Sequence, residues 1–424
     1  MSAAPELTSL PNADRRAVIT GLGVVAPNGI GTEAWWKATQ AGKSGIGRIT
    51  HFDPSQYPAQ LAGEVDGFNA SDYIDQRLIV QTDRWTHMAL AATQMALEDA
   101  QFDPEGADPY RMSVITASGS GGNEFGQKEI QNLWGKGPIF VGAYQSIAWF
   151  YAATTGQIAI KYGMKGPCGV VIQEGAGGLE ALWHSRRNII RGVDFVISGG
   201  TEAPIGPYAL TCQLTNGRLS VETEPDEAYR PFDERANGYV PGEGGAIIIV
   251  ESREQAEERK APQVYGEIAG YGATNDAFHA KRATDDGSQL ARAMKLALER
   301  AGIGAKDVDA VFADAAGTPE GDAAEAQAIK EVLGTKVPVT APKTMVGRLY
   351  GGGAPLDVAA ALLAMRDGVL PPTINLDSPA KACADLAFVT GKSKQAKLET
   401  VLVNARGFGG FNSALVLRRG SASA

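Results

Sequence analysis

An internal duplication of strand and helix patterns constrains the fold of this chain most strongly. An apolar strand running into a glycine turn is predicted over 18–25, and a similar one over 265–272. Each is followed by an amphipathic, Ala-rich helix. The large apolar residues of these helices are Met88, Leu90, Met95 and Leu97 in the first half and Leu290, Met294, Leu296 and Leu298 in the second. A chain with this repeated order is expected to form two similar halves.

The later strands repeat in the same way. Apolar strands are predicted over 112–116 and 308–312, and each half ends in a strand pair joined through a Gly-rich connection. These pairs are 195–200 with 245–250 and 401–404 with 413–417. Because strands that alternate with helices form βαβ units, we expect mostly parallel sheets buried on both faces. The predicted fold class is α/β, with duplicated βαβ halves in a five-layered α/β/α/β/α arrangement.

A charged stretch over 251–262 marks the predicted boundary between the halves. We expect an N-terminal half over 18–262 and a C-terminal half over 263–418. A flexible tail over 1–17 and a short tail over 419–424 are expected at the ends. The charged stretch also suits a helix with a solvated face. With 424 residues the chain is long enough for two core-sized units.

Charge and cysteine content exclude several classes of protein. The formal net charge of −9 argues against non-specific nucleic-acid binding. It does not favour an acidic carrier protein either, unless Arg186, Arg187 and Arg191 form a local basic patch, and a solvated helix face explains these arginines better. The three cysteines give no disulfide framework and suit a reducing cytoplasm. No Cys/His cluster indicates a metal site.

The uncharged segment Pro138–Ile160 is long enough to cross a bilayer. It contains several Gln, Ser, Thr and Gly residues, however, which a membrane span disfavours. We therefore expect no membrane span here, but a helix buried at a subunit interface.

The segment 170–182 predicts a strand, a tight turn and the start of a helix. The N-terminus of a helix can stabilise a negatively charged nucleophile. Between Glu174 and the helix, however, the turn offers only Gly and Ala. The scaffold suits acyl chemistry, yet it carries no attacking atom.

Six further motifs resemble the signature of the condensing-enzyme (β-ketoacyl synthase) family. They occur in order over 198–202, 231–235, 238–246, 313–319, 343–347 and 407–412. The resemblance runs from about Val18 to Arg418, and it implies the thiolase fold. This implication agrees with the duplication.

In that family, a Cys attacks an acyl thioester and two His support decarboxylation of malonyl-carrier protein and the developing enolate. Alignment on the motifs places Gly175 at the nucleophile position, Asp314 at the first His and Arg348 at the second. Glycine cannot attack, Arg348 cannot act as a base, and the charge of Asp314 opposes an enolate. The acidic and basic residues retained from the family pattern are Lys343, Asp322 and Glu325.

This combination is similar to the chain-length factor, the β subunit of type II polyketide ketosynthases. The similarity is strongest over 144–151, 155–158 and 349–357. It implies a heterodimer with a catalytic ketosynthase α subunit and an interface tunnel for the growing poly-β-ketone. It also implies an acyl carrier protein that delivers the phosphopantetheine, so the chain needs no cofactor of its own. Many chain-length factors carry Gln at the position of Gly175, whereas here Gln173 stands two residues earlier.

The resemblance also maps tunnel positions onto a helix after the strand 112–116. These positions are Asn123, Gly126 and Ile130, at helical spacings of three and four. Their small or medium size predicts a comparatively deep tunnel. Alternatively, they only pack beneath the Gly-rich loop that precedes the helix.

Three functions are compatible with the sequence. The favoured one is a non-catalytic subunit that sets product length in an acyltransferase complex. The second is an enzyme, either a malonyl-carrier protein decarboxylase that uses Gln173 and Lys343 or a divergent β-ketoacyl synthase. The third is a homodimeric scaffold. Cys168, seven residues before the turn, is predicted to be an inert core thiol.

Overall fold

The computed structural model describes residues 14–280 and 283–420, and two half-sheets organise it. The first contains β1 (Ala17–Ala26), β5 (Met112–Ala117), β6 (Gly169–Val171), β7 (Phe195–Glu202) and β8 (Gly244–Ser252). The second contains β9 (Gly266–Asn275), β10 (Ala310–Phe312), β11 (Pro338–Thr340), β15 (Thr400–Gly407) and β16 (Phe411–Arg419). Their spatial orders are β6-β5-β7-β8-β1 and β11-β10-β15-β16-β9, so equivalent strands occupy equivalent places. The predicted duplication is confirmed.

Strand directions repeat as well, but the expectation of mostly parallel sheets was wrong. The parallel pairings are β5 with β6 and β7 in the first half and β10 with β11 and β15 in the second, where β11 also pairs in parallel with β13 (Ala387–Phe388). The last two pairings, β7-β8-β1 and β15-β16-β9, are antiparallel. The final strand of each half returns beside its predecessor without a crossover helix, and only a parallel pairing requires one. Short antiparallel pairing of β1 with β9 joins the two half-sheets.

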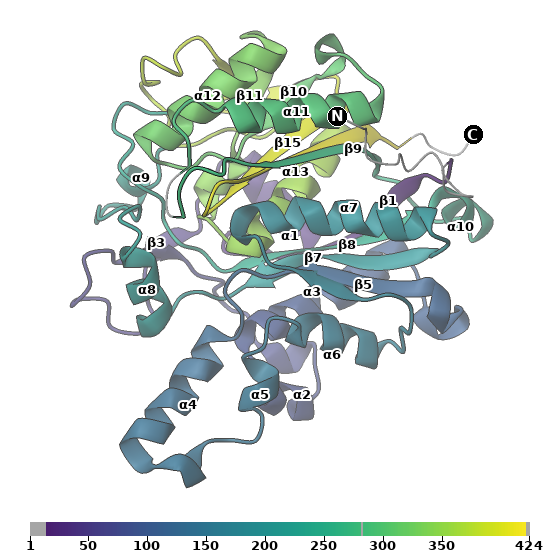
Figure 1. The fold of residues 1–424 in the computed structure, drawn as a ribbon, viewed down its shortest axis with the longest axis vertical. Coiled ribbons are helices and arrows are strands. Elements are labelled where there is room, and N and C mark those ends of the chain that lie inside the picture. Colours follow the sequence, from purple (N-terminus) through teal and green to yellow (C-terminus); the bar gives the residue numbers. More distant parts are fainter. Residues whose placement is uncertain (1–13, 281–282, 421–424) are drawn as a thin grey trace.

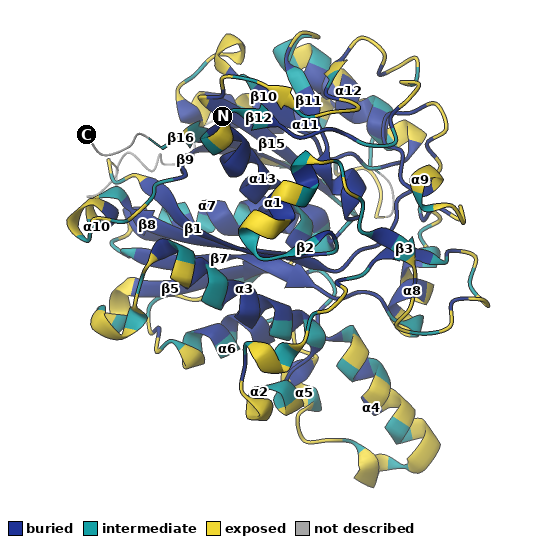
Figure 2. Cartoon of the chain, turned by 180° about the vertical axis from the view of Figure 1, so that it is seen from behind, coloured by how far each residue is buried: buried dark blue, intermediate teal, exposed yellow. Residues whose placement is uncertain are grey.

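Helices complete five layers, as predicted (Figure 1). The outer layers are formed by α3 (Arg84–Ala100) with α6 (Ala153–Lys161), and by α11 (Ser288–Ala301) with α12 (Pro319–Leu333). Between the half-sheets lie α7 (Gly177–Ile190) and α13 (Gly353–Asp367). All but three residues of α13 are buried, as expected for a helix covered on both sides. Figure 2 shows the same burial in both half-sheets.

Glycines inside the first strand of each half explain how the outer helices pack. Gly23 and Gly272 were expected at turns, but they lie within β1 and β9. A Cβ on Gly23 would lie 1.8 Å from the carbonyl oxygen of Ala92 in α3, and one on Gly272 would lie 1.9 Å from that of Ala293 in α11. The absence of a side chain therefore lets each helix approach its strand closely.

A protruding arm consists of α4 (Asn123–Lys136), the short 3-10 helix η5 (Pro138–Phe140) and α5 (Gln145–Ala148), at the bottom of Figure 1. The segment 138–160 is therefore not one buried helix, because turns separate η5, α5 and α6. Several of its large apolar side chains are exposed on the single chain, including Ile139 at 88% and Trp149 at 49%, whereas Ile158 is buried. Across residues 14–280 and 283–420, no helix is long and apolar enough to cross a membrane.

The remaining elements are short or peripheral. They are β2 (Gly29–Ile30), α1 (Thr32–Gln40), β3 (Ile46–Arg48), β4 (Leu61–Gly63), α2 (Gln76–Gln81), α8 (Pro207–Leu214), α9 (Pro225–Ala228), α10 (Arg253–Glu258), β12 (Val369–Leu370), β13 (Ala387–Phe388) and β14 (Lys394–Gln395). The charged stretch at the expected boundary forms α10, and we propose a division into halves at 262/263. Of the predicted tails, residues 1–13 and 421–424 lie outside the described residues. Within the expected tail 1–17, the described residue Arg15 forms an ion pair with Asp194 at 2.5 Å.

Candidate functional site

The predicted strand, turn and helix are formed by β6, the 3-10 helix η6 (Glu174–Ala176) and α7. Gly175 is buried between them and the end of β15. A Cβ at this position would lie 2.5 Å from the carbonyl oxygen of Arg406 and 3.3 Å from Nη2 of Arg348. The neighbouring backbone therefore fills the space that a side chain would occupy here.

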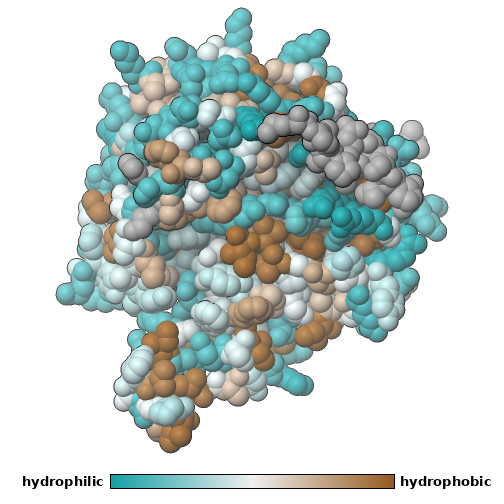
Figure 3. Space-filling model, in the orientation of Figure 1, coloured by the Kyte–Doolittle hydropathy of each residue, from teal (hydrophilic) through white to brown (hydrophobic). Residues whose placement is uncertain are grey.

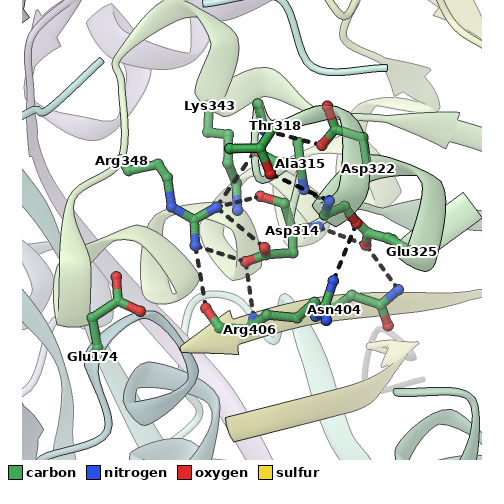
Figure 4. A network of polar contacts seen from close by, with 12 residues as sticks. Glu174, Asp314, Ala315, Thr318, Asp322, Glu325, Lys343, Arg348, Asn404 and Arg406 are labelled. Atoms are coloured by element: carbon green, nitrogen blue, oxygen red, sulfur yellow. Dashed lines mark hydrogen bonds and ion pairs between the residues drawn. The ribbon is translucent and has the colours of Figure 1, made fainter. Parts of the chain in front are cut away.

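Asp314 and Arg348 form a buried ion pair beside Gly175 (Figure 4). Asp314 follows β10, and Arg348 follows the 3-10 helix η8 (Pro342–Met345). Arg348 Nη1 donates to Oδ2 of Asp314 at 3.1 Å and Nη2 donates to Oδ1 at 3.2 Å. Nη2 also donates to the carbonyl oxygen of Arg406 at 3.2 Å. The two residues satisfy each other and hold the end of β15 in place.

The electrostatics of the pair fit a permanently ionised state. Burial opposes the charge of Asp314, but Arg348 and then Lys343 hold the pKa of this carboxyl below its ordinary value. Burial likewise opposes the charge of Arg348, but Asp314 raises the pKa of the guanidinium well above its ordinary value. Neither group can exchange a proton near neutral pH, so neither suits general acid–base catalysis.

The retained polar residues support the surrounding backbone. Lys343 pairs with Asp357 at 2.7 Å. Glu325 accepts hydrogen bonds from the backbone N–H groups of Asp314 and Ala315, each at 2.8 Å. Asp322 accepts from Gly317 at 3.0 Å, and burial raises the pKa of its carboxyl to about 8. Glu325 and Asp322 thus hold the segment 314–317, whereas Lys343 pairs with a side chain of α13.

Two cavities adjoin the pair. The larger, of about 470 Å³, is lined by Gln173, Arg348 and residues of several loops. The smaller, of about 20 Å³, is lined by Gly175 and Lys343. Gln173 lines the larger cavity and Lys343 the smaller, and both cavities are lined by Asp314 and Arg348.

The three predicted tunnel residues lie together on α4. Asn123, Gly126 and Ile130 line one cavity of about 300 Å³ at the base of the arm. Its other lining residues, which sequence reasoning missed, are Gln127, Gln145, Trp149 and Tyr208. The indole of Trp149 covers Gly126, since a Cβ there would lie 3.0 Å from its Cδ1.

Two further expectations concern cysteines and metals. The predicted core position of Cys168 was wrong, because this thiol is exposed just before β6, where β6 is an edge strand. Within the described parts of the chain, no group of three or more His, Cys, Asp or Glu side chains could hold a metal ion.

Comparison with known proteins identifies the scaffold. The family model described as "Beta-ketoacyl synthase, N-terminal domain" matches residues 14–256, and its C-terminal counterpart matches residues 265–377. This chain belongs to the β-ketoacyl synthase family. It is 52% identical to the tetracenomycin polyketide synthase ketoacyl synthase beta subunit of Streptomyces glaucescens, over 96% of this chain and 99% of that protein.

Solved structures of the β-ketoacyl synthase family share the fold. The ishigamide ketosynthase/chain length factor superposes with a TM-score of 0.90 at 28% identity, covering 96% of this chain and all of the other. A type II PKS acyl-carrier protein in complex with its ketosynthase, bound to the hexaketide, superposes with a TM-score of 0.87 at 29% identity. That match covers 96% of this chain and all of the other. The predicted thiolase-like fold is confirmed.

Within this β-ketoacyl synthase scaffold, sequence reasoning missed Arg406. Its backbone carbonyl closes the space at Gly175, and its backbone N–H donates to Oδ1 of Asp314 at 2.9 Å. Both contacts are made by main-chain atoms, so no side-chain motif signals them. The site thus contains the ion pair of Asp314 and Arg348, with the carbonyl of Arg406 packed against Gly175.

Proposed function

We propose that this chain is the non-catalytic, chain-length-determining subunit of a heterodimeric type II polyketide ketosynthase. One observation carries the proposal: Gly175 has no room for a nucleophile, and the ion pair of Asp314 and Arg348 stands beside it. The partner in this proposal is a catalytic ketosynthase α subunit, which supplies the attacking cysteine. The relative from Streptomyces glaucescens, named a ketoacyl synthase beta subunit, supports this assignment.

The remaining components follow from the same proposal. An acyl carrier protein delivers malonyl units on phosphopantetheine, so this subunit holds no cofactor. The complex works in the cytoplasm and contacts neither nucleic acid nor membrane. The named complex of an acyl-carrier protein with its type II PKS ketosynthase supports a carrier-protein partner.

The arm supplies the surface for the α subunit in this proposal. Large apolar side chains are exposed on it. Figure 3 shows brown, hydrophobic atoms on the arm at the bottom of the view. The exposed side chains include Ile130, Trp134, Ile139 and Phe140. Exposed apolar patches of this kind mark protein–protein interfaces. The cavity of Asn123, Gly126 and Ile130 lies beside this surface, so the tunnel would run along the interface.

Reconstitution tests the function. The chain, the α subunit and both together are incubated with malonyl-carrier protein, and polyketide and released CO₂ are measured. We expect polyketide only from the pair, which size-exclusion chromatography resolves as a heterodimer. Decarboxylation by this chain alone would support a priming enzyme instead, and condensation by it alone a divergent synthase. If the chain forms a homodimer and does not bind the α subunit, the result would indicate a scaffold.

The tunnel assignment has a separate test. Gly126→Phe places an aromatic ring in the cavity of about 300 Å³, against Trp149. We expect shorter polyketides from the reconstituted pair, because the ring blocks part of the tunnel. Gly106→Phe is the matched control, since Gly106 lies outside the arm, between α3 and β5, and a Cβ there meets no atom within 4 Å. An unchanged product length with Gly126→Phe would refute the assignment.

A further inference from the structure

Helix α4, which carries the proposed tunnel residues, has no capping side chain of its own. Its N-cap residue is Gly122, and no side chain at that position can accept from the first turn. The first N–H groups of a helix have no partners within the helix, and they need an acceptor from elsewhere.

Asp83 supplies this acceptor from another helix. It is the N-cap of α3, where Oδ1 accepts from the backbone N–H of Trp85 at 3.2 Å. Its second oxygen, Oδ2, accepts from the backbone N–H of Phe125, in the first turn of α4, at 2.7 Å. Asp83 is 3% exposed. One buried carboxylate therefore caps two helices, and it links the core helix α3 to the arm.

Few other polar contacts hold the base of the arm. Gln127 of α4 accepts from the backbone N–H of Tyr208 at 2.9 Å, and Gly122 donates to the carbonyl oxygen of Trp149 at 3.2 Å. Both Tyr208 and Trp149 are about half-exposed, whereas Asp83 stands at the start of a helix packed on β1. The bond from Asp83 thus ties the first turn of α4 directly to the core, beside the preceding loop, whose Gly119 and Ser120 donate to the buried Glu202 at the end of β7.

We propose that Asp83 is a positioning residue for product length, because it fixes the first turn of α4 and so places Asn123, Gly126 and Ile130 along the tunnel. The inference rests on the proposed function of α4 as a tunnel wall. Ile130 lies about 10 Å along the helix from Asn123, so a tilt of roughly 10° at the first turn would move it by about 2 Å. A displacement of this size changes the free length of a narrow tunnel.

The test uses one variant that keeps the cap of α3 but removes that of α4, and one control variant at another helix. Asp83→Ser keeps an oxygen for Trp85 within its own helix, since Ser is a good N-cap. Its side chain is shorter by one bond, so it does not reach Phe125. Ser252→Ala is the matched control, because Ser252 caps α10 through Gln255 at 3.2 Å, far from the arm in sequence and in Figure 1. Both variants are measured as heterodimers with the α subunit and malonyl-carrier protein, alongside Gly126→Phe.

We expect Asp83→Ser to broaden the product-length distribution, while Ser252→Ala keeps the native one. In hydrogen exchange, Asp83→Ser is expected to speed exchange at the amide of Phe125 and through α4, with α11 unchanged. A native distribution from Asp83→Ser, while Gly126→Phe shortens the product, would overturn the role of Asp83 and leave the proposed function intact. If neither Asp83→Ser nor Gly126→Phe changes the length of the product, the proposed function itself fails.

Two remaining outcomes are also decisive. An intact Asp83→Ser heterodimer that makes less polyketide of unchanged length would overturn the proposal, since it would indicate a structural role only. Should Asp83→Ser not yield soluble heterodimer, Asp83→Thr replaces it in the same test. Its hydroxyl can still cap α3 but is also one bond too short to reach Phe125, so the same broadening is expected, and a native distribution overturns the proposal.

Discussion

Replacing Arg348 with methionine would leave the Asp314 carboxylate without its ion-pair partner in the core. Asp314 is 2% exposed, and Arg348 donates to both of its oxygens. Removing one member of a buried ion pair typically costs about 3–5 kcal/mol. Asp314 would keep the backbone N–H of Arg406 at 2.9 Å and the charge of Lys343 nearby. We therefore expect the lower end for Arg348→Met, a loss of about 3 kcal/mol in unfolding free energy at pH 8.

The loss of unfolding free energy in Arg348→Met is expected to increase with pH. In the native chain the pKa of Asp314 lies below its ordinary value of 3.8, so the pair stabilises the fold above that value. Without Arg348, burial raises the pKa of Asp314 instead. Stability is then lost as pH rises from about 4 through the raised pKa, because the unfolded chain releases the proton more readily. The cost of Arg348→Met is therefore greater at pH 8 than at pH 5.

Urea denaturation of the full-length chain, at one fixed protein concentration, measures this cost at both pH values. The double variant Arg348→Met/Asp314→Asn is the control, because it removes the stranded charge and keeps an oxygen for the N–H of Arg406. We expect it to recover most of the loss, and the single variant Asp314→Asn completes the cycle that gives the coupling energy between the two sites. A cost below about 1 kcal/mol at pH 8, or one equal at both pH values, would refute the argument that burial makes the ion pair essential.

Two further predictions concern the same region. Gly175→Cys is expected to destabilise the chain by about 1–3 kcal/mol, because its Cβ would meet the carbonyl oxygen of Arg406. Thermal unfolding measures this loss of stability. In an acyl-transfer assay, Gly175→Cys is expected to gain no condensing activity; a gain would show that the ion pair does not prevent catalysis at this site. Burial raises the pKa of Glu202 from 4.5 to about 7. Between pH 5 and 8 the native chain is therefore expected to lose about 2–3 kcal/mol of stability that Glu202→Gln does not lose, and parallel denaturation profiles for the two would contradict this assignment.

The extent of correct prediction differs among the elements. Strands such as β1, β5 and β9 and helices such as α3 and α11 were predictable, because apolar residues at strand or helix spacing reveal them locally. Strand direction was not, since β8 and β16 return antiparallel through connections whose course no periodicity encodes. The segment 138–160 was predicted as one helix from its lack of charge, but lack of charge does not set where turns fall.

Some features of the candidate site were also predictable from the sequence, and others were not. The residue types at 175, 314 and 348 by themselves led to the prediction that the family's nucleophile and both histidines are absent, because reactivity belongs to each side chain. That α4 follows the strand 112–117 and carries Asn123, Gly126 and Ile130 at helical spacing was equally readable.

Only the tertiary structure decided what occupies the vacated space. Asp314 and Arg348 are 34 residues apart, and the carbonyl of Arg406 that closes Gly175 comes from the other half of the chain. The double cap by Asp83 likewise includes a bond to Phe125, 42 positions away in the sequence. Such contacts depend on strand order and on how layers pack, so they arise from the whole fold. The sequence by itself determined what this site lacks, and long-range packing decided that an ion pair and a backbone carbonyl would fill it.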